Sequence, residues 1–228
     1  MADIRIKARD GGDFMAYLAG STGPGIVLIQ EIFGVNKVMR DLADGLAKQG
    51  YLVACPDIFW RQEPGIQLTD KTEKEWARAF ELYKGFKERA GVDDLIATVA
   101  HVRGLKGCSG KVGTVGYCLG GKLAYLMAAR SDADANIGYY GVTIENALGE
   151  AKKIKKPLML HIAAKDQFCP KEAQTKIRDG LGKHPQVTLH TYAKVDHAFA
   201  RKGGEHYDAA AAKLANDRTA KFFKQHLS

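Results

Sequence analysis

The stretch KVGTVGYCLGGKL, residues 111–123, decides the fold because it joins a strand pattern to a helix pattern. Its first half is rich in β-branched residues, which suit a buried parallel strand, and residues 119–130 hold good helix formers with apolar side chains at helical spacing. Between them, Gly116-Tyr117-Cys118-Leu119-Gly120 has the pattern G-x-C-x-G. The same strand-turn-helix pattern with serine at the centre presents a nucleophile, so the sequence predicts that Cys118 is one.

Such a turn is so tight that small residues are needed two positions before and two after the nucleophile. The turn places Cys118 at the N-terminus of the following helix, where the helix dipole favours a thiolate and free backbone N–H groups can hold an oxyanion. The simpler alternative is a buried cysteine in an ordinary glycine-rich turn.

An acid and a histidine follow Cys118 in the order that an α/β-hydrolase uses. Asp166 comes directly after the apolar run 158–163, and His197 comes just after the strand-like run 187–192. Both residues therefore leave the carboxyl ends of predicted strands, the edge where an open α/β sheet carries its site. Asp196 is a rival acid, but it adjoins His197, and adjacent side chains generally point apart.

At 228 residues, a single α/β domain over residues 1–228 is the simplest expectation, because single α/β domains commonly reach this size. No apolar stretch approaches the length of a membrane span, and the N-terminus begins a strand pattern instead of a signal peptide. The four cysteines form no C-x-x-C pair, which favours neither a disulfide framework nor a metal site and fits a reduced, cytoplasmic location. The net charge of +8 comes from scattered lysines without a binding motif, so nucleic acid is not an expected partner.

The remaining pattern predicts strands that alternate with helices. Residues 4–8 and 14–19 flank a turn signal and predict an N-terminal antiparallel hairpin. The apolar run 26–29 predicts a buried parallel strand. Thr72-x-x-Glu75 is a capping box for a helix through Arg89, which Gly91 is expected to break. We therefore expect a mostly parallel central sheet with helices on both faces.

The chain resembles the dienelactone hydrolase (carboxymethylenebutenolidase) family over nearly its whole length. The resemblance is carried by the motifs Gln30-Glu31-Ile32-Phe33-Gly34-Val35-Asn36, Cys55-Pro56-Asp57, Ala90-Gly91-Val92, Val115-Gly116-Tyr117-Cys118-Leu119-Gly120-Gly121, Gly138-Tyr139-Tyr140-Gly141-Val142 and the surroundings of Asp166 and His197. It implies an α/β-hydrolase fold and hydrolysis of a small lactone or ester without cofactor or metal.

In that chemistry Cys118 attacks a carbonyl to form a thioester acyl-enzyme, His197 is the base and later the acid, and Asp166 orients the imidazole. Backbone N–H groups of Ile32 and Leu119 are the expected oxyanion donors.

The resemblance also implies roles for further side chains. Glu31 matches a glutamate that contacts the resting cysteine, although a salt bridge with Arg201 is an alternative that does not exclude this role. Arg201 matches an arginine that holds a substrate carboxylate. At the position of the family's second substrate arginine, this sequence has Trp76, and Arg78 follows two residues later. Trp76, Arg78 and the nearby Tyr83 are therefore candidate substrate-binding residues.

Dienelactone, hydrolysed to maleylacetate within the family, is the leading substrate. A general carboxylesterase or thioesterase with the same triad is the first alternative, and a non-hydrolytic binding or redox protein is the second. The expected partner is a small lactone or ester, with or without a carboxylate. The expected assembly is a monomer or small homo-oligomer.

Overall fold

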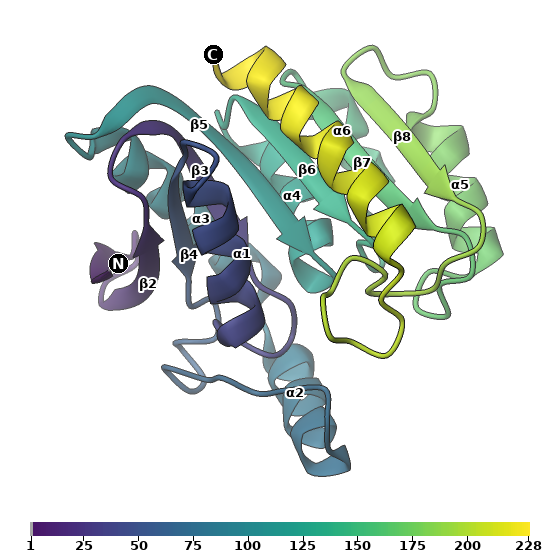
Figure 1. Cartoon of the computed structure of the whole chain (residues 1–228), viewed down its shortest axis with the longest axis horizontal. Coiled ribbons are helices and arrows are strands. Elements are labelled where there is room, and N and C mark those ends of the chain that lie inside the picture. Colours follow the sequence, from purple (N-terminus) through teal and green to yellow (C-terminus); the bar gives the residue numbers. More distant parts are fainter. Residues whose placement is uncertain (1) are drawn as a thin grey trace. The chain divides into compact units, whose positions relative to one another are not determined.

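A computed structural model describes residues 2–228, which divide into two compact units, one that ends at Gly113 and one that spans Thr114–Ser228. The prediction of one domain over residues 1–228 stays a prediction. The elements of the first unit are β1 (Ala2–Lys7), β2 (Asp13–Ala19), β3 (Gly23–Ile29), α1 (Lys37–Ala47), β4 (Leu52–Pro56), α2 (Glu73–Gly85) and α3 (Glu88–Gly104). Strand β5 (Cys108–Tyr117) leads into the second unit (Figure 1). The elements after it are α4 (Leu119–Arg130), β6 (Ala135–Tyr139), the 3₁₀ helix η1 (Ile144–Lys153), β7 (Leu158–Ala163), α5 (Lys171–Leu181), β8 (Val187–Tyr192) and α6 (Ala209–Leu227).

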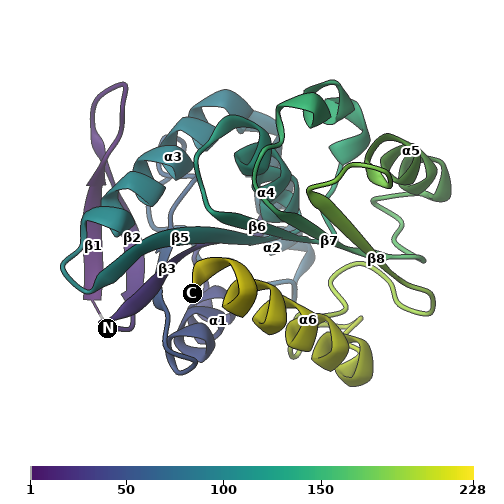
Figure 2. The same ribbon diagram turned by 90° about the horizontal axis from the view of Figure 1, so that it is seen from above.

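The strands of the first unit follow the order β1-β2-β4-β3. The hairpin β1–β2 is antiparallel, as predicted, and β3 pairs with β4 in parallel. Helices α1 and α3 lie on opposite faces of these strands (Figure 2). The consecutive residues Ile26–Ile29 of β3 are all wholly buried, so side chains on both faces of this strand are covered. This confirms the prediction of a strand that is buried on both faces.

The predicted helix from the Thr72 cap through Arg89 is confirmed as far as Gly85 and wrong at its C-terminal end. Thr72 does cap α2 and accepts a hydrogen bond from the Glu75 N–H, but α2 ends at Gly85. The chain then starts α3, in which Gly91 lies inside the helix instead of breaking it. The reason is packing, because a Cβ on Gly91 would lie 2.2 Å from the ring of Phe86. The glycine makes room for that aromatic side chain.

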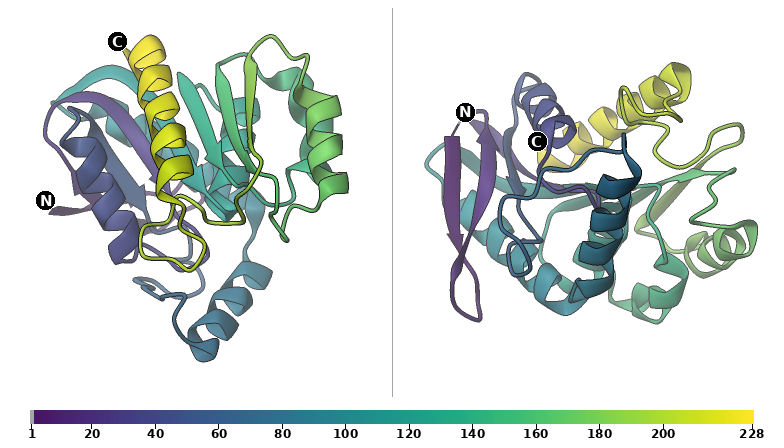
Figure 3. Two further views of the ribbon diagram at one scale, coloured as in Figure 1. Left: turned by 45° about the vertical axis from the view of Figure 1, so that its right-hand side comes forward. Right: turned by 90° about the horizontal axis from the view of Figure 1, so that it is seen from below.

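The strands of the second unit follow the order β5-β6-β7-β8, and the pairs β6–β7 and β7–β8 are parallel. Helix α4 and helix α6 both pack on β6 and β7, from opposite faces (Figure 2). Helix α5 lies beside β8 (Figure 3). The carboxyl ends of β5, β6, β7 and β8 therefore lead to one edge of this unit, as parallel strands require.

A buried polar cluster joins α6 to the middle strands of the second unit. The ring nitrogens of His161 lie 2.8 Å from the Tyr192 hydroxyl and 3.1 Å from the Thr219 hydroxyl. The Tyr139 hydroxyl in turn lies 2.6 Å from that of Thr219. Both ring nitrogens of this buried histidine therefore have hydrogen-bond partners. In the described part of the chain, no helix is long and apolar enough to cross a membrane.

Candidate active site

The turn between β5 and α4 has the geometry that its glycines predict. Cys118 lies between the last strand residue and the first helix residue with φ 56° and ψ −115°, a conformation that L-residues rarely adopt. A Cβ on Gly116 would lie 1.9 Å from the Gly120 carbonyl oxygen, and one on Gly121 would lie 2.5 Å from the Tyr139 carbonyl oxygen. Only glycine fits at these two positions, so the local sequence fixes the place of the thiol.

Backbone amides surround the thiol at the start of α4. The Cys118 N–H donates to the Tyr139 carbonyl at 3.1 Å, which ties the turn to the end of β6. The Leu119 N–H, by contrast, has no acceptor among the described residues. An N–H without an acceptor beside a nucleophile is the feature that an oxyanion hole needs.

The structure brings Asp166 and His197 together from separate loops. Asp166 follows β7, His197 follows β8, and the Asp166 Oδ2 lies 2.8 Å from the His197 Nδ1. Both side chains are buried, with 1% of the Asp166 side chain and 5% of the His197 side chain exposed. The Asp196 carboxylate has another partner, because it accepts a hydrogen bond from the His197 backbone N–H. The imidazole therefore has Asp166 as its acid partner.

His197 also hydrogen-bonds to Cys118, so the three predicted residues form a continuous chain of contacts. Burial alone lowers the pKa of His197. The charge on Cys118 and the hydrogen bonds to Asp166 and Cys118 outweigh that effect and raise this pKa to about 10. The groups on either side of His197 thus stabilise its protonated form, the imidazolium.

Two aromatic side chains that the sequence did not indicate contact the imidazole. The ring of Tyr140 lies 5.1 Å from that of His197 at 61°, and the ring of Phe168 lies 4.9 Å from it at 71°. The Phe168 N–H donates to the Asp166 Oδ1 at 2.8 Å. The only sequence signals were the position of Phe168 two residues after the predicted acid and the place of Tyr140 at the end of a strand.

Strained backbone gathers around these residues. Among the described residues, four that are not glycine have positive φ, and they are Cys118, Tyr140, Thr143 and Ala198. Cys118 is a predicted site residue, Ala198 adjoins His197, and the ring of Tyr140 contacts the imidazole. Such strain persists only where the surrounding structure holds it, and it is common at functional sites.

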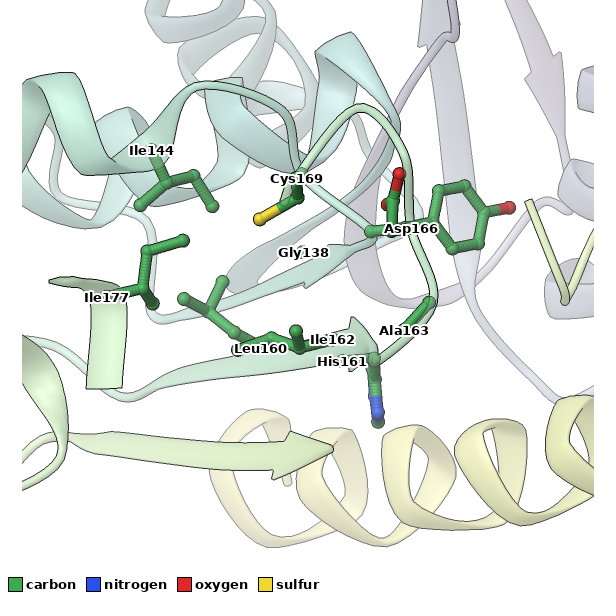
Figure 4. A pocket seen from close by; sticks show the side chains of 11 residues that line it. Gly138, Ile144, Leu160, His161, Ile162, Ala163, Asp166, Cys169 and Ile177 are labelled. Atoms are coloured by element: carbon green, nitrogen blue, oxygen red, sulfur yellow. The ribbon is translucent and has the colours of Figure 1, made fainter. Parts of the chain in front are cut away.

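A small cavity of about 10 Å³ lies next to Asp166, with room for one water molecule at most. In Figure 4 the Cys169 side chain points toward Ile144 on one side of it, while His161 points the other way, toward α6. This space is too small for a substrate. Cys169 is buried, and the pKa of its thiol is raised to about 12. Burial is the main cause, and the charges of Asp166 and Glu145 raise this pKa in the same direction. These surroundings are those of a structural thiol.

The first unit contains Glu31 and Ile32, in the loop after β3. Both are buried, and the Gln30 amide holds this loop by donating to the Glu31 carbonyl at 3.2 Å. Their predicted roles beside Cys118 stay predictions.

The other candidate substrate residues of the first unit lie on α2. Trp76 packs edge-on against Phe33 at 4.9 Å, so it supports the residue that follows Ile32. Arg78 forms ion pairs with Glu63 and Glu81, and Tyr83 is half-buried near the end of the helix. Roles in substrate binding stay predictions for all three.

In the second unit, Arg201 lies four residues after His197 and is buried. Its backbone N–H donates to the Ala198 carbonyl at 2.9 Å, which closes the turn that carries the histidine. Its role toward a substrate carboxylate also stays a prediction.

The model of the Dienelactone hydrolase family matches residues 14–227. The chain is 52% identical, over 100% of both sequences, to a putative carboxymethylenebutenolidase of Azospirillum brasilense. It is 41% identical to a carboxymethylenebutenolidase of Pseudomonas putida, over 96% of this chain and 94% of that protein. The crystal structure of a putative dienelactone hydrolase from Klebsiella pneumoniae subsp. pneumoniae MGH 78578 has the same fold, with a TM-score of 0.87 at 24% identity over 99% of this chain and 98% of that one.

The fold is that of an α/β-hydrolase, and these relatives make the protein a hydrolase of ester or lactone bonds. The chain belongs to the dienelactone hydrolase family. The resemblance inferred from the sequence motifs is confirmed.

Proposed function

We propose that this protein hydrolyses a small lactone or ester through Cys118, His197 and Asp166, with dienelactone, converted to maleylacetate, as its leading substrate. The observation that carries the proposal is the chain of contacts from the Asp166 carboxylate through the imidazole to the thiol. The relatives that share 41% and 52% identity are named for carboxymethylenebutenolidase activity, which supports the choice of lactone.

In the first step the Cys118 thiolate attacks the carbonyl carbon, and a C–S bond forms. The negative charge that develops on the carbonyl oxygen is stabilised by the Leu119 N–H, and we assign the second donor to the Ile32 N–H. The C–O bond then breaks, and the His197 imidazolium gives its proton to the leaving oxygen. In a lactone the new hydroxyl or enol stays attached to the acyl group.

In the second step water attacks the thioester. The now neutral His197 removes a proton from that water, the C–S bond breaks, and the carboxylic acid leaves with the thiolate and imidazolium restored. The His197 Nδ1–H donates a hydrogen bond to the Asp166 carboxylate throughout, which keeps Nε2 directed at Cys118. We assign Glu31 to formation of the resting thiolate and Arg201 to recognition of a substrate carboxylate. A reactive thiolate needs a reducing environment, so the cytoplasm is the proposed location.

A carboxylesterase that takes uncharged esters is the second candidate function. Two guanidinium nitrogens of Arg78 are already occupied by ion pairs with Glu81 and Glu63. Trp76 stands at the position of the family's second arginine. A pocket with one arginine and an aromatic wall would favour a less charged substrate.

The test compares hydrolysis of cis- and trans-dienelactone with that of a simple aryl ester, in the native protein, in Cys118→Ala and in Cys108→Ser. Cys108 is a control thiol in β5, outside the turn. We expect fast dienelactone turnover that Cys118→Ala abolishes and Cys108→Ser retains. Aryl ester turnover without dienelactone turnover would select the carboxylesterase. Turnover that survives in Cys118→Ala would refute the mechanism.

A further inference from the structure

We propose that Phe168 contacts the leaving group of the substrate and makes the protein selective for esters and lactones whose leaving oxygen carries a flat, apolar substituent. This inference rests on the proposed function, because it uses His197 as the acid that protonates the leaving oxygen. It adds a specificity-determining residue and a substrate class to that function.

The first observation is the exposure of the ring. Phe168 is 40% exposed although its centroid lies 4.9 Å from that of the buried His197. The exposed part of the ring is apolar surface left in water directly beside the proposed acid, where an apolar group of a substrate can cover it. Tyr140, the other ring in contact with the imidazole, is only 2% exposed and has little surface to offer a ligand.

The second observation is that the ring sits on an ordered part of the loop after β7. The Phe168 N–H donates to the Asp166 Oδ1, and the next residue, Cys169, is buried and donates its N–H to the Asp166 carbonyl at 3.3 Å. The Gln174 amide donates to the Cys169 carbonyl at 2.7 Å. The carboxylate that orients the imidazole thus also fixes the backbone that carries the exposed ring. A ring held in this way presents its surface with little loss of conformational entropy.

The chemistry decides which part of the substrate meets that surface. When the tetrahedral intermediate collapses, the leaving oxygen must lie within hydrogen-bond reach of the proton that His197 donates. The carbon substituent on that oxygen then lies beside whatever flanks the imidazole. Of the two flanking rings, Phe168 is the one with accessible surface. A flat aryl, benzyl or enol substituent would pack on it edge to face or offset, which is the geometry that aromatic pairs favour.

A purely structural role makes a different prediction. If Phe168 only held the imidazole in place, its loss would slow every step in which His197 takes part. Formation and hydrolysis of the acyl-enzyme would suffer alike, whatever the leaving group. If Phe168 binds the leaving group, the loss falls mainly on acylation by substrates with a flat apolar leaving group.

The experiment measures kcat/KM for benzyl acetate and ethyl acetate, which share the acetyl group and release alcohols of similar acidity. It uses the native protein, Phe168→Ala, Phe168→Leu and the control Leu214→Ala, which removes an apolar side chain that is 46% exposed on α6. Both substitutions at 168 keep the backbone N–H that Asp166 requires. We expect Phe168→Ala to lower kcat/KM for benzyl acetate about three- to tenfold more than for ethyl acetate, with an intermediate effect for Phe168→Leu and none for Leu214→Ala. Hydrolysis of the shared acetyl-enzyme should slow less than acylation by benzyl acetate.

Equal losses on both esters, or no loss on either, would overturn the inference. Cys118→Ala in the same assay separates the two proposals. If that variant keeps its turnover, the proposed mechanism fails, whereas Cys118-dependent turnover with equal losses in Phe168→Ala refutes only the role of Phe168.

Discussion

His161 makes the stability of this protein sensitive to acid in a way that one substitution can isolate. Its side chain is fully buried, and both ring nitrogens contact hydroxyl groups. Burial lowers its pKa well below 6.5, and the nearby His190 and Arg218 lower this pKa further. The unfolded chain therefore takes up a proton at this residue at a pH where the folded chain does not. Stability is lost as the pH falls below 6.5, until the folded-state pKa is reached.

The size of the effect follows from linkage. Each pH unit in which the unfolded histidine is protonated and the folded one is neutral costs about 1.4 kcal/mol. Because the unfolded histidine is half protonated at pH 6.5, this one group removes up to about 2.3 kcal/mol from the free energy of unfolding between pH 6.5 and 4.5. That is a large share of the total stability of an ordinary domain.

The substitution His161→Gln removes the titrating group and keeps an amide that can bond to the same hydroxyls. Urea denaturation of both proteins at several pH values between 4.5 and 7.5 gives the two free energies of unfolding. Because all other groups are common to both proteins, the difference between the two curves isolates His161. We expect the native protein to lose stability relative to the variant below pH 6.5. Parallel curves would show that the folded protein protonates His161 as easily as the unfolded chain does, and would refute the reasoning.

Three further predictions concern the site and its surroundings. Asp166→Asn should lower kcat for ester hydrolysis about 10³-fold with little change in thermal stability, and a loss below tenfold would argue against its role in orienting the imidazole. Gly121→Ala should destabilise the protein by more than about 2 kcal/mol, because its Cβ would lie 2.5 Å from a carbonyl oxygen of β6. Gly149→Ala, whose Cβ meets nothing within 4 Å, should stay close to native in the same thermal melt. Cys55 and Cys169 are buried, and burial raises the pKa of both thiols, so they should react with a disulfide reagent only on unfolding. Rapid labelling of either thiol in the native protein would contradict the described burial.

The sequence predicted those features that depend on neighbouring residues. The turn at Cys118 follows from glycines within three positions of it, and the helix after it spans Leu119–Arg130, as its pattern indicated. The acid was identified from its place after a strand, and the 2.8 Å contact between Asp166 and His197 agrees with that choice over Asp196. Those inferences needed only local spacing and the order of elements.

Features that depend on packing between distant residues were not predicted. Gly91 reads as a helix breaker, and only the position of the Phe86 ring shows why it lies inside α3. The contacts of Tyr140 and Phe168 with the imidazole likewise come from three different loops. Periodicity carries no signal for such contacts, because it reports which face of an element is apolar and not which side chains meet there.

The positive φ angles at Cys118, Tyr140 and Ala198 bear on how this protein would respond to laboratory evolution. Each such conformation costs about 1–3 kcal/mol, and glycine would release much of that cost. A screen of random variants for heat resistance alone would therefore enrich glycine at these positions, and with it proteins that have lost the nucleophile or loosened the histidine. Selection for thermostability in this scaffold should be coupled to a turnover assay from the first round.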